Sequence, residues 1–246
     1  MSDALQELVA KGDKDRYLSS LFAPQSRWPH LLALYAFNIE ITRIRDTVSE
    51  PQLGLVRQQW WLDELYGIYA GRSPEHPLAA SLANAIAFAK LPREPLAGLI
   101  VAREFDLYDD VMPSLNDLEG YLGETSSVIM QLAAMILGGL APEVAGLAGI
   151  AFGIADVLRS GRSIYVPADL VQASGEDAAR MALCAHARKR LAEARAIGVS
   201  PDLLPAFLPA SLTELYLSRL ERKLPKEISQ VCRQAILWWA ARCNRF

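Results

Sequence analysis

Two acidic residues in the stretch R-I-R-D-T-V-S-E-P, residues 43–51, have a spacing that suits metal binding. Asp46 and Glu50 are four residues apart, so on a continuous helix both carboxylates would lie on one face, one turn apart. Such a pair can bind a hard divalent cation or a cation-bound phosphate, because these cations prefer oxygen ligands. The alternative is that the two residues form only the polar, solvated end of a helix, since Pro51 follows directly. The residues alone leave both interpretations open.

The elements that would position this pair are helices. Apolar residues recur at helical spacing along most of the chain, and no run alternates with the period of a strand. This pattern predicts an all-α fold, and the prolines fall between the expected helices or in their first turns. Ser114 and Asp117 have the spacing of a capping box. The expected helices cover residues 3–11, 13–22, 27–49, 53–70, 77–90, 93–111, 114–138, 142–160, 176–197, 201–209, 212–222 and 226–244. Residues 160–175 form the longest segment without an expected helix, and we expect this loop to close over something rather than to separate domains.

Composition predicts a globular protein with one domain. Hydrophobic residues make up 52% of the 246 residues, and no repeat or Gly/Ser linker marks a boundary, so we expect one domain over residues 1–246. Residues 128–158 carry only two charges, but Gly138, Gly139 and Pro142 divide them into runs shorter than a spanning helix needs. Two buried core helices are therefore expected there. The 3 cysteines lack a CxxC spacing and nothing at the amino terminus resembles a signal peptide, which favours a reducing, cytoplasmic location.

Charge is distributed unevenly along the chain. Residues 180–246 have a net charge of +7, and residues 1–179 have a net charge of −10. The basic C-terminal part could contact anionic lipid headgroups, which would make the protein peripheral on the inner membrane, or an acidic partner. The alternative is an ordinary solvated surface. No nucleic-acid-binding motif accompanies the charge, so nucleic acid is not an expected partner.

Two pairs of adjacent tryptophans stand out on the expected helices: Trp60 with Trp61, and Trp238 with Trp239. They could act as stacking platforms for a ligand. Tryptophans on amphipathic helices more often pack in a core or an interface, and we favour packing for all four.

Longer motifs point to a known family. The stretches DRYLSSLFAPQSRWPHLLALYAFNIEITRIRDTVSEP, VRQQWWLDELYGIYAG, LIVAREFDLYDD, LEGYLGETSSVIMQLAAMILGG and FGIADVLRSGRSIYVPADL follow one another along the chain. In kind and in order they resemble the squalene/phytoene synthase family, and the resemblance covers most of the sequence. It implies a single-domain, all-α bundle of the isoprenoid synthase type around a central apolar cavity.

The resemblance also implies where a metal site would lie. Active members hold Mg²⁺ and a prenyl diphosphate between two aspartate-rich helices, and the first of these helices corresponds to Asp46 through Glu50. The second motif, normally Asn-x-x-Arg-Asp-x-x-x-Asp, is reduced here to IADVLRSGR, in which Asp156 is the only acid. Glu104 and Asp106 match a further acidic pair. If the protein is active, Mg²⁺ is the expected cofactor and Asp46 and Glu50 are the catalytic candidates; otherwise no cofactor is expected.

Three further residues match the family segment that touches diphosphate: Arg159, Arg162 and Tyr165. Arginine suits this role because its guanidinium group binds phosphate oxygens through two parallel hydrogen bonds. The alternative is that these arginines pair with Asp46, Glu50 or Asp156 and neutralise a vestigial site.

The stretch YLGETSSVIM resembles a divergent branch of the family. That branch contains the mitochondrial assembly factor for respiratory complex I and its alphaproteobacterial relatives. Together with the incomplete second motif, the resemblance implies a catalytically impaired protein that acts as a binding or assembly factor for complex I subunits. The alternatives are an Mg²⁺-dependent transferase that joins two prenyl diphosphates head to head, and a carrier that holds an isoprenoid or lipid in the cavity without turning it over.

Overall fold

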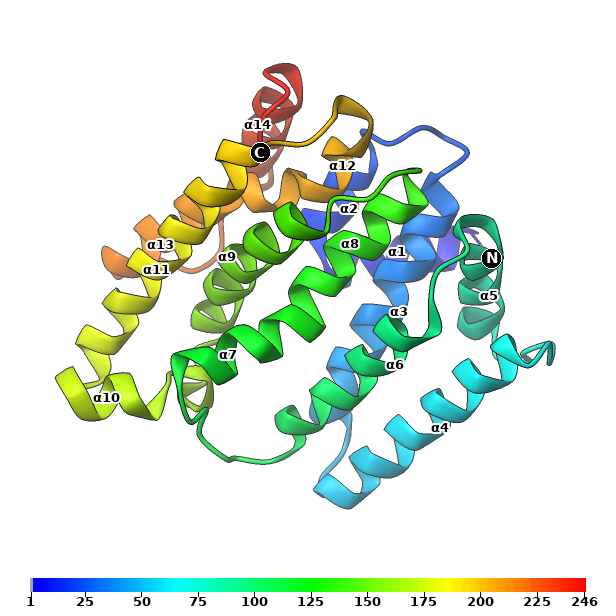
Figure 1. Ribbon diagram of the computed structural model, residues 1–246, viewed down its shortest axis with the longest axis horizontal. Coiled ribbons are helices and arrows are strands. Elements are labelled where there is room, and N and C mark those ends of the chain that lie inside the picture. The colour runs from blue at the N-terminus through cyan, green and yellow to red at the C-terminus, as the bar shows by residue number, and fades with distance from the viewer. Residues whose placement is uncertain (1) are drawn as a thin grey trace. The chain divides into compact units, whose positions relative to one another are not determined.

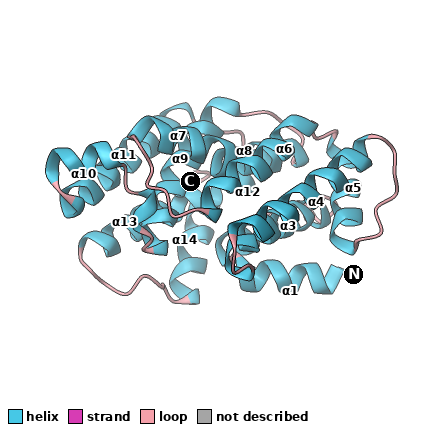
Figure 2. Cartoon of the chain, turned by 90° about the horizontal axis from the view of Figure 1, so that it is seen from below, coloured by secondary structure: helices cyan, strands magenta, loops and turns pink. Residues whose placement is uncertain are grey.

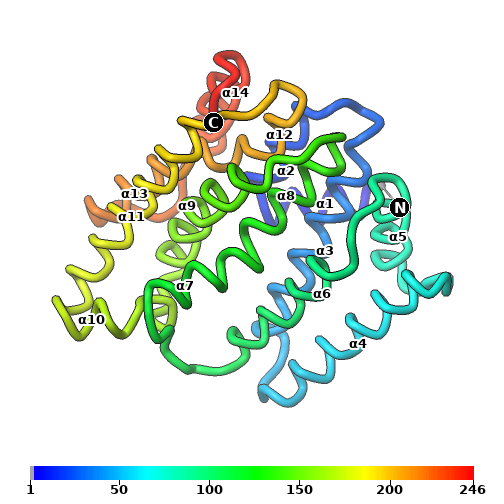
Figure 3. The backbone as a smooth tube through the Cα atoms, in the orientation of Figure 1, coloured from blue at the N-terminus to red at the C-terminus, as the bar shows by residue number. Residues whose placement is uncertain are grey.

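The computed structural model describes residues 2–246, and every regular element among them is a helix or a helical turn. Figure 2 shows the helices joined by loops, with no strand in the described part of the chain. The predicted all-α fold is therefore confirmed. Contacts between Cα atoms divide the chain into two units, and the chain crosses between them at residues 109/110, 131/132 and 140/141. Each unit is therefore built from more than one segment of the sequence. The path of the chain through these segments can be followed by colour in Figure 3.

The first unit runs to Asp109 and also includes Leu132–Leu140. Its central helix is α3 (Trp28–Thr47), which packs against α1 and α5 and less extensively against α4. Every residue of α3 from Leu31 to Ile39 is buried, as expected for a helix that is apolar on nearly all sides. The other elements are α1 (Ser2–Gly12), α2 (Lys14–Ser20), α4 (Pro51–Tyr69), α5 (Pro77–Ala89), α6 (Arg93–Ala102), the 3₁₀ turn η1 (Arg103–Leu107) and the second part of α8 (Val128–Ile136).

The second unit comprises Asp110–Gln131 and Ala141–Phe246. Its central helix is α9 (Pro142–Ser160), which packs most extensively against α11 (Glu176–Ile197), as labelled in Figure 1. The remaining elements are α7 (Leu115–Leu122), the π-helical turn η2 (Gly123–Ser127), η3 (Ser163–Tyr165), α10 (Ala168–Ser174), η4 (Pro201–Leu203), α12 (Leu204–Phe207), η5 (Leu208–Leu212), α13 (Thr213–Glu221) and α14 (Gln230–Arg242).

Several local signals that the sequence contains act as expected. Pro51, Pro77 and Pro142 open α4, α5 and α9. The side chain of Ser114 accepts a hydrogen bond from the Asp117 backbone N–H at 3.2 Å and donates to the Asp117 carboxylate at 2.6 Å, so Ser114 caps α7 where a helix start was predicted. Gly138, with φ of +98°, ends the first of the two predicted core helices, and both helices bury their apolar side chains. None of the helices within residues 2–246 is both long and apolar enough to cross a membrane.

Three predictions of helix bounds are wrong, one of them being the helix expected over residues 226–244, which begins only at Gln230 as α14. The helix expected over residues 93–111 ends as α6 and η1 at Leu107, because Met112 pairs with the next part of the chain instead. The Met112 N–H donates to the Ile164 carbonyl at 2.7 Å, and the Met112 carbonyl accepts from the Ala168 N–H at 2.9 Å. The expected loop over residues 160–175 contains a short helix, α10, which packs against α11.

Candidate functional site

The first acidic motif does not lie on one helix. Helix α3 ends at Thr47, Val48 is extended, and Glu50 is the extended N-cap residue of α4 with φ −129° and ψ 139°. The ring of Pro51 disfavours the helical conformation at the residue before it, so the chain turns between the two acids. Asp46 and Glu50 are both exposed, on either side of this break. The prediction that they share a helical face is therefore wrong.

The second acidic pair lies on the 3₁₀ turn η1, which packs against α3 and α4. The approach to α4 is close: a Cβ added to Gly54 would lie 2.5 Å from a methyl group of Leu107. Asp106 is only 4% exposed and forms an ion pair with Arg103 at 3.1 Å. Glu104 is exposed and borders a pocket of about 310 Å³ lined by residues of α4 and α6. The two acids thus have different surroundings, one paired in the protein interior and the other open to solvent.

A further ion pair lies beside Asp46 in the first unit. Arg45, which precedes it in α3, lies 3.6 Å from the carboxylate of Asp109, just beyond η1. The side chain of Asp109 is 83% exposed, so the pair is screened by water and contributes little stability. It does place a positive charge next to the first acidic motif.

In the second unit, Asp156 and Arg159 lie one turn apart on α9. Their side chains form an ion pair at 3.5 Å, in which Asp156 is mostly exposed and Arg159 mostly buried. The guanidinium carbon of Arg159 lies 3.8 Å from the ring centre of Tyr216, on α13, in a cation–π contact. One of the predicted alternatives, an arginine that pairs with Asp156, is therefore confirmed for Arg159.

Arg162 and Tyr165 lie together in the turn after α9. Arg162 donates to the Tyr165 hydroxyl at 3.4 Å, and its guanidinium carbon lies 5.5 Å from the centre of the same ring. Tyr165 is buried, with its ring 5.7 Å from that of Tyr121 on α7. Gly161, with φ of +78°, ends α9 and turns the chain into this segment. The structure thus keeps the predicted diphosphate-binding residues Arg159, Arg162 and Tyr165 on one end of α9 and the turn that follows it.

The predicted metal ligands do not form a Mg²⁺ site within either unit. Mg²⁺ is bound through several oxygen ligands at near-ideal octahedral geometry. Across residues 2–246, no group of three or more His, Cys, Asp or Glu side chains could hold a metal ion. Asp106 and Asp156 are each engaged by an arginine of the same unit. The acidic side chains of either unit, taken alone, do not supply the oxygen ligands that Mg²⁺ needs. Mg²⁺ binding by the protein stays a prediction.

The G-E-T-S-S stretch forms the π-helical turn η2 between α7 and α8. Thr125 donates its hydroxyl to the Tyr121 carbonyl at 2.7 Å, and Ser127 donates to the Gly146 carbonyl of α9 at 3.0 Å. A Cβ added to Gly149 would lie 2.3 Å from the Ser127 Cα atom, so only glycine permits this approach. π-Helical turns are rare and occur frequently at functional sites. In this structure the buried residues of the turn, Thr125, Ser126 and Ser127, form a close junction with α9.

The sequence is similar to those of known proteins over most of its length. The family profile described as Squalene/phytoene synthase matches residues 9–236. The chain belongs to the squalene/phytoene synthase family. It is 31% identical over 241 residues to NADH dehydrogenase (ubiquinone) complex I, assembly factor 6, of Bos taurus, with 88% of this chain and 72% of the relative covered. The Homo sapiens protein of the same name gives the same identity and coverage.

Solved structures of the squalene/phytoene synthase type share the fold. The squalene synthase HpnC from Alicyclobacillus acidocaldarius is 24% identical with a TM-score of 0.71, covering 99% of this chain and 95% of that one. A dehydrosqualene synthase in complex with ligand is 17% identical with a TM-score of 0.81, covering 98% and 95%. The predicted family and the predicted isoprenoid synthase-type fold are confirmed.

One polar cluster of this family member joins a residue of a quoted motif to two residues that no motif contains. Glu119 on α7 accepts from His186 at 2.6 Å and from Arg190 at 2.7 and 3.0 Å, and both partners lie on α11. Burial raises the pKa of Glu119, but the hydrogen bonds from Arg190 and His186 outweigh this, so the net pKa is lowered. The acid and its partners are 67 and 71 residues apart, and no spacing rule connects them. The cluster joins α7 to α11 through charge-assisted hydrogen bonds.

Sequence reasoning also missed the junction between α9 and η2. The signal was present as Gly149 and Gly153, two glycines on a helix that buries most of its side chains, where an added Cβ would lie 2.3 Å from Ser127 and 2.7 Å from Leu122, respectively. Glycines three or four residues apart lie on one face and permit close approach of another backbone. The pattern could have located the contact surface, although not the partner that fills it.

Proposed function

We propose that this squalene/phytoene synthase family member is a non-catalytic protein that assists the assembly of respiratory complex I. The observation that carries the proposal is its identity of 31% over most of its length to complex I assembly factor 6. Identity to the squalene synthase HpnC is 24%, and identity to the dehydrosqualene synthase is 17%. The shared fold is compatible with either role, so the pattern of identities favours the assembly role.

The acidic side chains support the same proposal. Ionisation of a prenyl diphosphate requires strong electrostatic stabilisation of the departing pyrophosphate, as part of a barrier lowering of roughly 8–23 kcal/mol in enzymes. Helix α9 offers one acid at the second motif, Asp156, and this acid is already paired with Arg159. In the first motif, Asp46 and Glu50 are separated by the helix break. This distribution of charge suits a binding protein better than a synthase.

A genetic experiment tests the assembly role. We expect deletion of the gene to lower the NADH:ubiquinone oxidoreductase activity of the host's membranes and the amount of intact complex I on native gels. Wild-type protein supplied in trans should restore both. The Asp46→Asn/Glu50→Gln variant should restore them equally well, because the proposal gives these carboxylates no catalytic task. Unchanged complex I after deletion would refute the proposal.

A second candidate is an Mg²⁺-dependent transferase that condenses two prenyl diphosphates. It is favoured by the diphosphate-binding positions that the chain retains at Arg159, Arg162 and Tyr165. Purified protein incubated with Mg²⁺ and labelled farnesyl or geranylgeranyl diphosphate separates the two functions. The assembly role predicts no release of pyrophosphate above that of the Arg162→Gln variant. Turnover that is lost in Asp46→Asn and in Arg162→Gln would establish the transferase, whereas tight binding without turnover would indicate an isoprenoid carrier.

A further inference from the structure

The outward face of α14 is apolar and aromatic. Val231 is 76% exposed, and the adjacent Trp238 and Trp239 are 59% and 65% exposed. Of the two kinds of packing that we expected, in a core or in an interface, packing in the core is thus excluded for this pair, and only Trp61 of the four tryptophans is buried, at 4% exposure. Soluble proteins seldom leave two adjacent tryptophans in water, because exposing so much apolar surface is unfavourable.

Helix α14 is firmly held on its other side, so this face is a fixed surface. Leu237 and Ala240 are buried, and α14 packs against η5. The side chain of Ser229 caps the helix by accepting from the Cys232 N–H at 3.2 Å. Just beyond the helix, the ring of Phe246 lies 5.5 Å from that of Phe207. The tryptophans are thus presented on an anchored helix rather than on a loose end.

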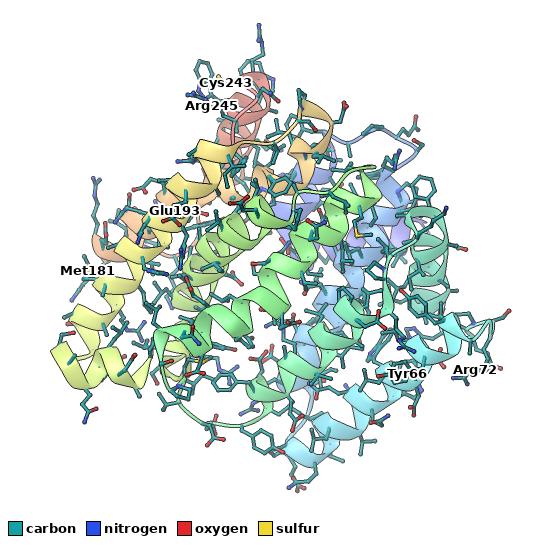
Figure 4. The ribbon with its side chains drawn as sticks, viewed as in Figure 1. Tyr66, Arg72, Met181, Glu193, Cys243 and Arg245 are labelled. Carbon is teal, nitrogen blue, oxygen red and sulfur yellow. The ribbon has the colours of Figure 1, made fainter. Side chains whose placement is uncertain are left out.

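The charge around this face is positive. Residues 228–246 contain three arginines and no acidic residue. Arg242 and Arg245 are exposed, and Figure 4 labels Arg245 and Cys243 just beyond the C-terminal end of α14. Arg233 is buried and lies under the helix, where it contacts the Tyr216 hydroxyl at 3.5 Å. Two arginines therefore accompany the exposed tryptophans.

A groove of about 1070 Å³ runs beside α14, and Trp239 is one of the residues that line it. Residues of α11 and α14 line it, mainly with apolar side chains, together with Arg195 and Arg245. Arg195 donates to the Phe246 main-chain oxygen. Burial and the charge of Arg245 lower the pKa of Arg195, while Glu214 acts in the opposite sense. An anion at the mouth of the groove would relieve the repulsion between the two arginines.

We propose that α14 and the adjoining groove form a docking surface for a membrane that contains anionic lipids. The helix would lie in the plane of the interface with Trp238 and Trp239 among the headgroups, where the amphipathic indole ring is favoured. Arg195, Arg242 and Arg245 would contact lipid phosphates, and the groove would accept part of an acyl chain. This inference does not rest on the proposed role in complex I assembly.

The combination of groups favours a bilayer over a protein partner. Tryptophan and arginine also occur at protein interfaces, but such interfaces match both signs of charge across a polar rim. Here the tryptophans lie within residues 228–246, where the exposed charged side chains, Arg242 and Arg245, are both basic, while the buried Arg233 pairs with the preceding Glu227 at 3.9 Å. Anionic lipid surfaces attract basic groups of this kind by about 1 kcal/mol each, or roughly fivefold in affinity.

Vesicle flotation tests the proposal. Purified full-length protein should float with vesicles of three parts phosphatidylcholine to one part phosphatidylglycerol, and much less with phosphatidylcholine alone. The Arg242→Gln/Arg245→Gln variant should bind the anionic vesicles about 25-fold more weakly, at roughly fivefold for each arginine. The Trp238→Ser/Trp239→Ser variant should lose at least about tenfold, because the inserted apolar area is removed.

A matched control comes from the first unit. Leu140 is 70% exposed, so Leu140→Ser removes a similarly exposed apolar side chain without touching α14. Its vesicle binding should equal that of the wild type, and circular dichroism should show all variants equally folded. As a second measurement, brominated anionic lipids should quench the fluorescence of the wild type more than that of the double tryptophan variant.

Three results would overturn the proposal. The first is an absence of wild-type binding to anionic vesicles at millimolar lipid, and the second is equal binding to both vesicle types. The third is vesicle binding that persists in the tryptophan and arginine variants. The surface is a protein interface instead if the wild type does not bind vesicles but does bind a protein partner that the double tryptophan variant no longer binds.

Discussion

The junction between α9 and η2 offers a sharp test of the fold through two glycines of one helix. Gly146 and Gly149 both lie in the interior of α9. A Cβ added to Gly149 would lie 2.3 Å from the Cα, 2.5 Å from the Oγ and 2.7 Å from the backbone nitrogen of Ser127. A Cβ added to Gly146 would meet nothing within 4 Å. The same substitution, glycine to alanine, should therefore have opposite effects at these two positions.

The magnitudes follow from three contributions. Alanine in a helix interior is favoured over glycine by about 0.8–1 kcal/mol at either position. At Gly149 the new methyl group overlaps main-chain atoms, and overpacking of this kind costs about 1–3 kcal/mol. Moving Ser127 aside also breaks its hydrogen bond to Gly146, which contributes about 1 kcal/mol. We expect Gly149→Ala to lose about 2 kcal/mol of unfolding free energy and Gly146→Ala to gain about 0.5–1 kcal/mol.

Urea denaturation followed by circular dichroism at 222 nm measures both changes against the wild type. For a chain of this size, 1 kcal/mol corresponds to about 2–4 °C in the melting temperature. Gly149→Ala should therefore melt about 4–8 °C below the wild type, and Gly146→Ala about 1–4 °C above it.

The comparison has a clear negative outcome. If Gly149→Ala were as stable as Gly146→Ala, the close approach of η2 to α9 would be wrong, since propensity alone would then account for both variants. Ser127→Ala provides a further check, because it removes the hydrogen bond without adding volume. It should lose about 1 kcal/mol, less than Gly149→Ala.

Three other predictions concern polar groups in the second unit. Replacing Glu119 by Gln should lower the free energy of unfolding by about 1–2 kcal/mol at neutral pH. Because the pKa of Glu119 in the folded protein is lowered below 4.5, the extra stability of the wild type in urea denaturation should be complete above pH 4.5 and should shrink as the pH falls through the folded-state pKa. A stability difference that is unchanged at pH 3 would contradict this. Arg188 of α11 forms ion pairs with two glutamates of α13, Glu214 and Glu221. Arg188→Gln should therefore lower the melting temperature by a few degrees at low salt and by less in 1 M NaCl. An equal decrease in melting temperature at both salt concentrations would show that these ion pairs do not cause it. Native protein should react rapidly with a thiol reagent at two cysteines, which are exposed, and slowly at Cys184, where burial raises the pKa to about 11; three equally fast thiols would show the opposite.

The sequence specified most helices because their boundaries carry local signals. The predicted bounds 142–160 and 176–197 agree with α9 and α11, which are delimited by Pro142, Gly161, Gly175 and Gly198. The bounds failed where the deciding contact is distant in sequence. Met112 leaves the helical path because Ile164 and Ala168 pair with it, 52 and 56 residues later. No local pattern contains that information.

In the candidate site, too, contacts between residues close in sequence could be predicted and contacts between distant residues could not. The acids and arginines could be named from the motifs, but their partners could be foreseen only where they were close in sequence. Asp156 and Arg159 are one helical turn apart, and the predicted pairing is confirmed. The contact of Arg159 with Tyr216, and the engagement of Glu119 by α11, connect residues more than 50 positions apart. The break between Asp46 and Glu50 is different, because Pro51 was visible and its effect on the preceding residue was underused.

The exposed tryptophans could also have been predicted, by angle rather than by composition. Successive residues of an α-helix are about 100° apart, so Arg233, Leu237 and Ala240 all point within about 60° of one another. These three residues are the buried ones of α14. Trp238 and Trp239 then lie about 130° from that direction, one on either side, and neither can reach the core. The same arithmetic on α4 places Trp61 with the buried Gln58 and Leu65 and turns Trp60 about 130° away, in agreement with their exposures of 4% and 43%. Both tryptophans therefore face away from the core of their own unit, and this is the physical basis for proposing a second apolar environment, a membrane, against α14.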